Sequence, residues 1–245
     1  MAAIARLFLL LAPVLCTAQA MGGINCCAPD QLMINLGQLQ GLAMPTGPAL
    51  SQVNSVQLAW DFTNKRVGEE IISITSGYVS RFKVIIDYAK NVMYTITEDM
   101  KCTKSEARGI IHQCIPKNAQ YVDTTVIGNN ELKADVYSYY NNVEQVYRGN
   151  ASITVSHKGC IPVGVTLIGE AISTDPPIPM VSAGGYSNFT MGIKDPGRWF
   201  DVPDICQGPQ PIHRRFAPKM DAISDNDQQL LKLVSHMAMS PFVRH

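Results

Sequence analysis

Cysteines are the residues of this chain whose chemistry can be interpreted most directly. A free thiol can act as a nucleophile or a metal ligand, whereas paired thiols oxidise to disulfides. Seven cysteines are present, and Cys16 lies in an apolar first segment. The six others are Cys26, Cys27, Cys102, Cys114, Cys160 and Cys206. An even number in a secreted chain predicts disulfides, and several connectivities remain open.

Thiol catalysis and zinc binding are the alternatives for these cysteines. His112 would share a strand face with Cys114, an arrangement that can activate a thiol. The even count favours a disulfide for Cys114 instead. Adjacent Cys26 and Cys27 do not suit zinc, because paired zinc ligands usually have about two to four residues between them.

No sequence motif of an enzyme is present. The chain lacks G-x-S-x-G, H-E-x-x-H, the P-loop and G-x-G-x-x-G. Ser156 precedes His157, but neighbouring side chains on a strand face opposite sides, so these two do not form a catalytic pair. We therefore expect no enzymatic activity.

Aspartates gather in two segments near the carboxyl end: Asp195, Asp201 and Asp204, and then Asp221, Asp225 and Asp227. Calcium prefers several oxygen ligands on an adaptable loop, so the first group is a candidate calcium site. A solvated turn is the alternative for the first group. Helix capping is the alternative for the second.

The first 20 residues are typical of a secretory signal. Arg6 is basic, residues 7–15 are apolar, and residues 18–20 form a small-x-small cleavage site. No later run reaches the about 18 apolar residues that a membrane-spanning helix needs. We expect a signal peptide at 1–20, one β domain at 21–207 and a tail at 208–245 of a secreted protein.

Charge and composition limit the partners. Lys plus Arg and Asp plus Glu each number 20, so no basic surface for nucleic acid is expected. Charged residues make up only 16% of the chain, compared with about 25% in typical domains. Sequons at Asn150 and Asn188 predict glycans that would add solubility to a secreted protein.

Alternating apolar residues predict a mostly β protein. Residues 81–88 and 92–97 flank a short Lys90-Asn91 turn and predict a hairpin. Other strands are expected at 31–36, 57–63, 67–75, 120–128, 131–139, 152–157, 162–170 and 187–193. Segments 172–186 and 207–220 are interpreted as connections, and a short amphipathic helix is expected after residue 224. Short connections favour an antiparallel sandwich or barrel.

The sequons indicate which way two strands face. A glycan on Asn188 or Asn150 must lie in solvent, and side chains alternate along a strand. Phe189 and Met191 should therefore turn inward, as should Ile153. Aromatic and aliphatic residues on inward faces either fill a core or line a cavity for an apolar ligand, and the pattern alone does not separate the two.

Several segments together resemble the ependymin family. They are CCAP at 26–29, AWDFTNKRVGEE at 59–70, VIIDYAKNVMYTITEDMKC at 84–102, IPKNAQYVDTTVIG at 115–128, HKGCIPV at 157–163 and FTMGIKDPGRWFDVPDIC at 189–206. The resemblance implies two curved antiparallel sheets that form a half-open barrel around a deep hydrophobic pocket, similar to bacterial lipoprotein carriers. It further implies a secreted or lysosomal glycoprotein, commonly a homodimer, that binds a hydrophobic or lipid-like ligand. Calcium binding and cell–matrix adhesion are also associated with the family, and no catalytic activity is implied.

Disulfide partners also follow from the resemblance. It implies the pairs Cys26–Cys160 and Cys102–Cys206, and it leaves Cys27 and Cys114 for a third. That third bridge departs from mammalian relatives, which place theirs at other positions.

The leading hypothesis is a secreted carrier of a hydrophobic ligand, and the alternative is a matrix or adhesion protein that acts through calcium, glycans and dimerisation. Residues expected to line or back the pocket are Trp60, Phe62, Phe82, Val84, Tyr94, Phe189 and Met191.

Overall fold

The computed structural model describes residues 26–208, apart from 45–47, 108–109, 144–146 and 173, together with the backbone of 243–244. The expected signal peptide, the second group of aspartates and the expected C-terminal helix lie outside the described residues.

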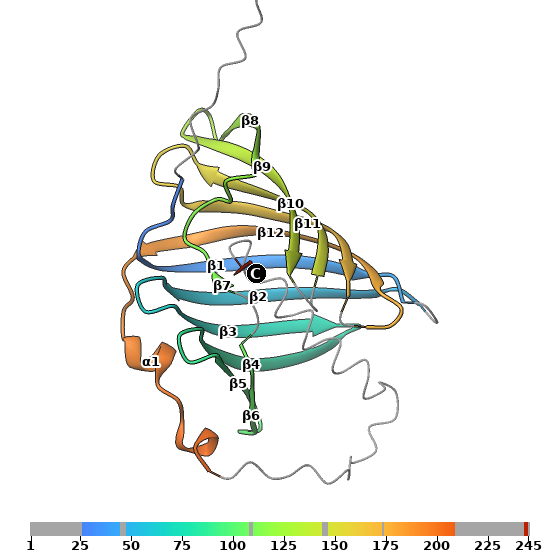
Figure 1. Ribbon diagram of the computed structural model, residues 1–245, viewed down its shortest axis with the longest axis vertical. Helices are drawn as coiled ribbons and strands as arrows, with labels where there is room; N and C mark the ends of the chain where they lie inside the picture. Colours follow the sequence, from blue (N-terminus) through green and yellow to red (C-terminus); the bar gives the residue numbers. More distant parts are fainter. Residues whose placement is uncertain are drawn as a thin grey trace, which may run out of the picture.

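Eleven strands form one antiparallel sheet in the order β6-β5-β4-β3-β2-β1-β12-β11-β10-β9-β8 (Figure 1). Their bounds are β1 (Gln31–Leu42), β2 (Leu50–Asp61), β3 (Arg66–Thr75), β4 (Tyr78–Asp87), β5 (Val92–Thr97), β6 (Cys102–Ser105), β8 (Gln120–Ile127), β9 (Leu132–Val143), β10 (Tyr147–Ser156), β11 (Pro162–Ala171) and β12 (Ile178–Met191). Two short strands, β7 (Ile110–Ile111) and β13 (Val243–Arg244), pair with each other.

The sheet consists of two meanders that meet where β1 pairs with β12. Strands β1 to β6 form one half and β8 to β12 the other, and residues 106–119 carry the chain from one edge of the sheet to the other. The edge strands β6 and β8 do not pair, so the curled sheet stays open. The expected all-β, half-open architecture is confirmed. What the sequence suggested as two sheets are two halves of a single continuous one.

Alternation along the strands gives the sheet two distinct faces. Leu32, Ile34 and Leu36 of β1 are buried on the inner face, whereas Gly37 and Leu39 are exposed on the outer face. The hairpin of β4 and β5 forms as expected around residues 88–91.

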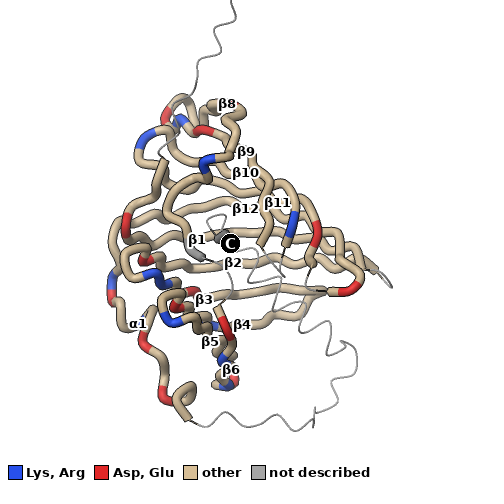
Figure 2. Tube along the Cα trace, viewed as in Figure 1, with Lys and Arg blue, Asp and Glu red and all other residues tan. Residues whose placement is uncertain are grey.

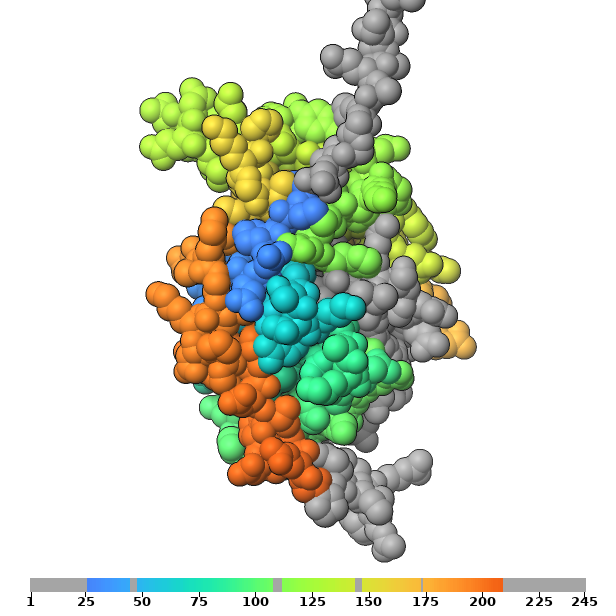
Figure 3. All heavy atoms as spheres, turned by 60° about the vertical axis from the view of Figure 1, so that its left-hand side comes forward, coloured from blue at the N-terminus to red at the C-terminus, as the bar shows by residue number. Residues whose placement is uncertain are grey.

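The two short helices lie on the outer face, at the β2–β6 end of the sheet. Helix α1 (Pro196–Phe200) packs Trp199 and Phe200 against Ala59 of β2. The 3-10 helix η1 (Asp204–Cys206) follows, and Cys206 packs against Ile85 of β4. Figure 3 shows this orange segment running along the blue, cyan and green segments of the first half. The two helices therefore pack on the outer face of the sheet and not on the inner one.

Strand β12 begins earlier than the sequence suggested. Segment 172–186 was expected to be a connection, but residues 178–186 continue the strand and pair with both β1 and β11. Gly184 is required there because a Cβ would lie 2.8 Å from Leu36 Cδ1 and 3.0 Å from the Gly37 carbonyl oxygen. The glycine that suggested a break is what allows the two halves of the sheet to approach closely.

Three disulfides connect distant parts of the chain, and their pairs are Cys26–Cys160, Cys27–Cys114 and Cys102–Cys206. Two of them are the pairs that the family resemblance implied, and the third joins Cys27 and Cys114, the two cysteines that it left over. Cys114 is thus no free thiol for His112 to activate.

Candidate functional site

The inner face of the sheet carries the main hydrophobic core of the described residues. One buried cluster contains side chains from both halves of the sheet, including Val56 and Ile71 from the first half and Ile153, Val165 and Leu167 from the second. The inward facing of Ile153 agrees with the exposed position of Asn150 on the same strand. Neither of the described helices packs on this face, and the two halves of the curl present apolar side chains to each other. Ala107 and Ile115, from the segment between β6 and β8, are buried in the same cluster, and β13 of the small β7–β13 sheet contacts β9.

Most of the expected pocket residues belong to this inner face. Trp60, Phe62 and Val84 are buried members of the cluster, and Phe82 and Phe189 pack against it while partly exposed. Phe62 follows β2 directly, and the others come from β2, β4 and β12, so the structure gathers residues that are far apart in sequence.

Tyr94 and Met191 do not take the expected positions. Tyr94 pairs with Ile85 and packs with it on the outer face, beside Cys102. Met191 is the last residue of β12 and is 71% exposed. The strand has a β-bulge between the pairs Met33–Thr190 and Asn35–Ser187, which shifts the alternation that the Asn188 sequon suggested.

A row of polar side chains crosses the inner face beyond the apolar cluster. Gln38 donates from Nε2 to Ser182 Oγ at 2.9 Å and accepts from Asn54 Nδ2 at 3.1 Å. Gln52 Nε2 donates to Ser73 Oγ at 2.6 Å. These buried residues from β12, β1, β2 and β3 were not singled out from the sequence. They give the inner face a polar end next to an apolar one.

Among the described residues, Glu69 is a buried carboxyl group of the inner face that forms no ion pair. It is 2% exposed, and its neighbours in the sheet register are Leu58 and Val84. Burial raises the pKa of Glu69 to about 8 because the charged form loses its hydration. The sequence does contain a signal for this residue. Glu69 shares one face of the expected strand with the apolar residues Val67 and Ile71, where a charged side chain is unexpected.

The hollows formed by described residues lie on the outer face. One of about 700 Å³ is bordered by Leu39, Val53, Ser152, Thr166 and Ala183. Another of about 470 Å³ lies near η1 and includes Ile72, Lys83 and Pro203. Neither coincides with the expected position between the two halves of the sheet.

The first aspartate group serves a local structural role. Asp195 caps α1 and accepts a hydrogen bond from the Arg198 backbone amide at 3.3 Å. Across the described ranges, no three His, Cys, Asp or Glu side chains gather in a way that could hold a metal ion, so Asp195, Asp201 and Asp204 do not form the expected cluster. The turn interpretation fits these residues better.

Comparisons with known proteins assign the chain to a family. The Ependymin family model matches residues 78–206. The chain belongs to the ependymin family. The development-specific protein LVN1.2 of Lytechinus variegatus is 33% identical over 158 residues, which cover 61% of this chain and 84% of that protein.

Solved structures similar to this ependymin-family chain are distant. A LolA superfamily protein of Nitrosomonas europaea is 10% identical, with 69% of this chain and 90% of that chain covered and a TM-score of 0.28. A putative outer membrane lipoprotein-sorting protein domain of Vibrio parahaemolyticus is 6% identical, with 68% and 88% covered and a TM-score of 0.30. Scores this low support no argument about function.

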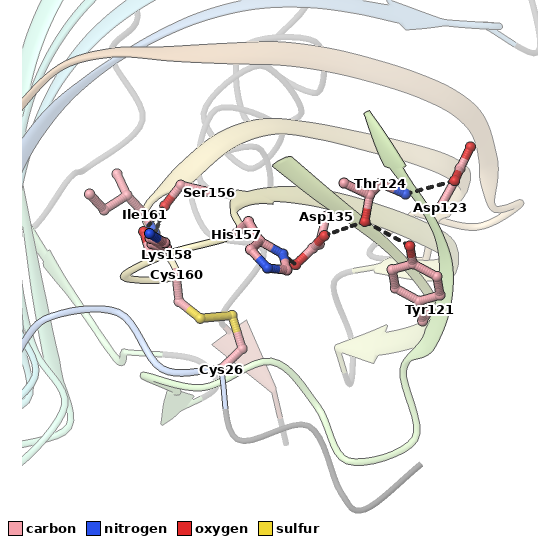
Figure 4. A network of polar contacts seen from close by, with 10 residues as sticks. All are labelled: Cys26, Tyr121, Asp123, Thr124, Asp135, Ser156, His157, Lys158, Cys160 and Ile161. Atoms are coloured by element: carbon pink, nitrogen blue, oxygen red, sulfur yellow. Dashed lines mark hydrogen bonds and ion pairs between the residues drawn. A yellow bond between two sulfur atoms is a disulfide. The ribbon is translucent and has the colours of Figure 1, made fainter. Parts of the chain in front are cut away.

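A second polar network of the ependymin-family chain lies at the start of β9 (Figure 4). Asp135 accepts from Thr124 Oγ1 at 2.6 Å and contacts His157 Nδ1 at 2.8 Å. Ser156 instead donates from Oγ to the Lys158 carbonyl oxygen at 2.7 Å. Ser156 and His157 therefore point to different partners, as strand alternation predicted, and the network fastens β8, β9 and the β10–β11 turn together.

Within the part of the chain that the structure describes, no helix is long and apolar enough to span a bilayer.

Proposed function

We propose that this ependymin-family protein is a secreted carrier that binds a hydrophobic, lipid-like ligand against the inner face of its curled sheet. The observation that supports the proposal most is the apolar cluster, which is formed by side chains from both halves of the sheet. A ligand chain that inserted between the two halves would lie among these side chains.

Burial of an apolar chain supplies the driving force. A ligand that removes roughly 300 Å² of apolar surface from water gains roughly 7 kcal/mol before the costs of ordering are subtracted. The polar row would then face the ligand's polar part, because the buried Asn54 Oδ1 and Gln52 Oε1 in this row have no hydrogen-bond partner.

A matched pair of substitutions on β3 tests the inner face. Ile71 lies on the inner face and Ile72, the next residue, is exposed on the outer face. Ile71→Phe should weaken the binding of a fluorescent fatty acid to the full chain, and Ile72→Phe should leave it unchanged. Circular dichroism confirms that both variants fold. Equal affinity in both variants, or no lipid in extracts of the purified protein, would remove the proposal.

Secretion and glycosylation belong to the same proposal. Three disulfides fit an oxidising compartment, and the side chains of Asn150 and Asn188 are exposed. A shift in mass after endoglycosidase treatment of secreted protein, lost in Asn150→Gln and Asn188→Gln, checks both sites.

We further propose a homodimer formed through the outer face. Leu39, Val53, Ile74 and Val79 are cross-strand neighbours in one row from β1 to β4, and each is 43–58% exposed. Figure 2 shows that the central strands carry few charges, while charged residues gather near α1 and β3 to β6. A two-fold contact places identical surfaces together, so an uncharged apolar row suits a second copy of this chain.

Calcium-dependent adhesion remains a prediction, and no observation on the described residues favours it over the carrier.

A further inference from the structure

Glu69 occupies an aromatic part of the inner face. Trp60 lies diagonally across the sheet from it, because Trp60 pairs with Val67 while Glu69 pairs with Leu58. Tyr186 of β12 packs on Trp60 with ring centroids 6.1 Å apart. Burial is the main cause of the raised pKa of the Tyr186 and Tyr88 phenols, and the charge of Glu69 raises both pKa values further, so both phenols lie within electrostatic reach of its carboxylate.

Two oxygen atoms in this group of side chains are buried without a hydrogen-bond partner. Glu69 Oε2 is fully enclosed and has no hydrogen-bond partner, and the same is true of the Tyr186 hydroxyl. Among the described side chains, none of the ion pairs includes Glu69. An unpaired carboxylate in apolar surroundings is costly, and proteins keep such groups mainly where a ligand satisfies them.

We propose that Glu69, with Trp60 and Tyr186, forms a recognition site for the ammonium group of a single-chain amphiphilic amine. The inference rests on the proposed ligand-binding function and names the class of ligand.

An ammonium group supplies what the site lacks. It carries three N–H donors, enough for Glu69 Oε2 and the Tyr186 oxygen together, and its charge pairs with the carboxylate. The face of Trp60 adds a cation–π attraction that strengthens away from water. An alcohol of the same chain length offers one donor and no charge, and a carboxylic acid brings a like charge toward Glu69. The same apolar chain should therefore bind most tightly when it ends in an amine.

Three probes with one chain length separate the head group from the chain. Dodecylamine, dodecanol and dodecanoate are titrated into the full chain by calorimetry below their critical micelle concentrations. We expect dodecylamine to bind at least about tenfold more tightly than dodecanol, the factor that one charge-assisted hydrogen bond supplies. Glu69→Gln should abolish this difference without weakening dodecanol, because the inner apolar face remains.

Two further variants keep the test decisive. Glu70→Gln changes the adjacent residue, which contacts Arg198 on the outer face, and should leave all three affinities unchanged. Tyr186→Phe keeps the ring that packs on Trp60 and removes only the hydroxyl, and it should weaken dodecylamine severalfold while sparing dodecanol.

The outcomes distinguish the two proposals. Equal affinity of wild type and Glu69→Gln for dodecylamine, with both proteins folded, would overturn the ammonium site but leave the carrier intact. Absence of binding for all three probes would overturn the carrier itself.

Discussion

Gly68 makes room for Trp199 on the outer face of β3. A Cβ at Gly68 would lie 2.8 Å from the Trp199 carbonyl oxygen and 3.1 Å from the Trp199 Cβ. The contact joins α1 to β3, although Gly68 and Trp199 are 131 residues apart in the chain. Trp199 is 1% exposed, so this contact is what fixes the segment that leads to the Cys206 disulfide.

A methyl group at Gly68 should displace α1. Gly68→Ala is expected to lower the free energy of unfolding by about 1–3 kcal/mol, since the backbone must shift to accommodate the new Cβ. Gly37→Ala is the matched control, because a Cβ there meets nothing within 4 Å. Urea denaturation of the two variants measures the difference, and equal stability would show that Trp199 does not depend on the gap.

The Cys102–Cys206 bridge should carry much of the stability of the same region. Cys206 is buried in a small cluster with Ile85 and Ile96. Replacing both cysteines with serine is expected to cost about 2–5 kcal/mol in thermal or urea unfolding. Hydrogen exchange should then increase first in β5 and β6. Unchanged protection of those strands would contradict this assignment.

Stability should depend on pH through Glu69. Its pKa is raised from 4.5 to about 8 by burial, so the folded state holds a proton that the unfolded state releases. This contribution is fully present below the unfolded pKa and is lost as pH rises through the folded value. Between pH 5 and 8 wild type should lose stability relative to Glu69→Gln by up to about 1.4 kcal/mol per pH unit. Thermal melts of both proteins at these pH values provide the measurement. The same dependence of stability on pH in both proteins would exclude the raised pKa of Glu69.

Amine binding should release a proton from Glu69. Because the pKa of the free carboxyl is raised, pairing with ammonium must first deprotonate it at neutral pH. The titratable groups that face it are Tyr88 and Tyr186, whose own pKa values are raised, so they stay neutral in this range. Dodecylamine affinity should therefore increase from pH 6 to pH 8. Calorimetry in buffers of different ionisation enthalpy counts the proton, and Glu69→Gln should release none.

A charge in the outer apolar row should dissociate the proposed homodimer. Val53 lies in the middle of that row, and Val53→Lys would place two ammonium groups together across a two-fold axis. Sedimentation velocity should then show a monomer with an unchanged circular dichroism spectrum. Lys133→Glu, on the distant strand β9, serves as the charge-changing control and should leave the dimer intact.

The sequence predicts where the strands lie better than it predicts which side chains of two neighbouring strands share a face of the sheet. The hairpin over 81–97 was correctly placed, yet Tyr94 faces outward while Val84 faces inward, because Val84 pairs with Thr95. A shift of one residue in register reverses every side chain of a strand, and the turn between β4 and β5 sets that register. Alternation within either strand contains no information about it.

The remaining differences have local causes. Proline and glycine made the first half of β12 look like a connection, although Gly184 is there for close contact with Leu36. Glu69 was not singled out although it lies in the predicted strand 67–75, because charged side chains on a strand are usually solvated. Long-range contacts between Trp60 and Tyr186 cannot be seen in a pattern of near neighbours, since they depend on how β12 meets β1.

Cys26–Cys160 and Cys27–Cys114 both lie at the end of the sheet where β1 begins and β10 finishes. At the opposite rim, around the β3–β4 turn, the described residues contain no disulfide. We therefore expect the curl to open most readily at that rim, and the proposed ligand would enter and leave there. The residence time of the ligand would then depend on how often this rim opens, as long as the disulfides at the other end remain intact.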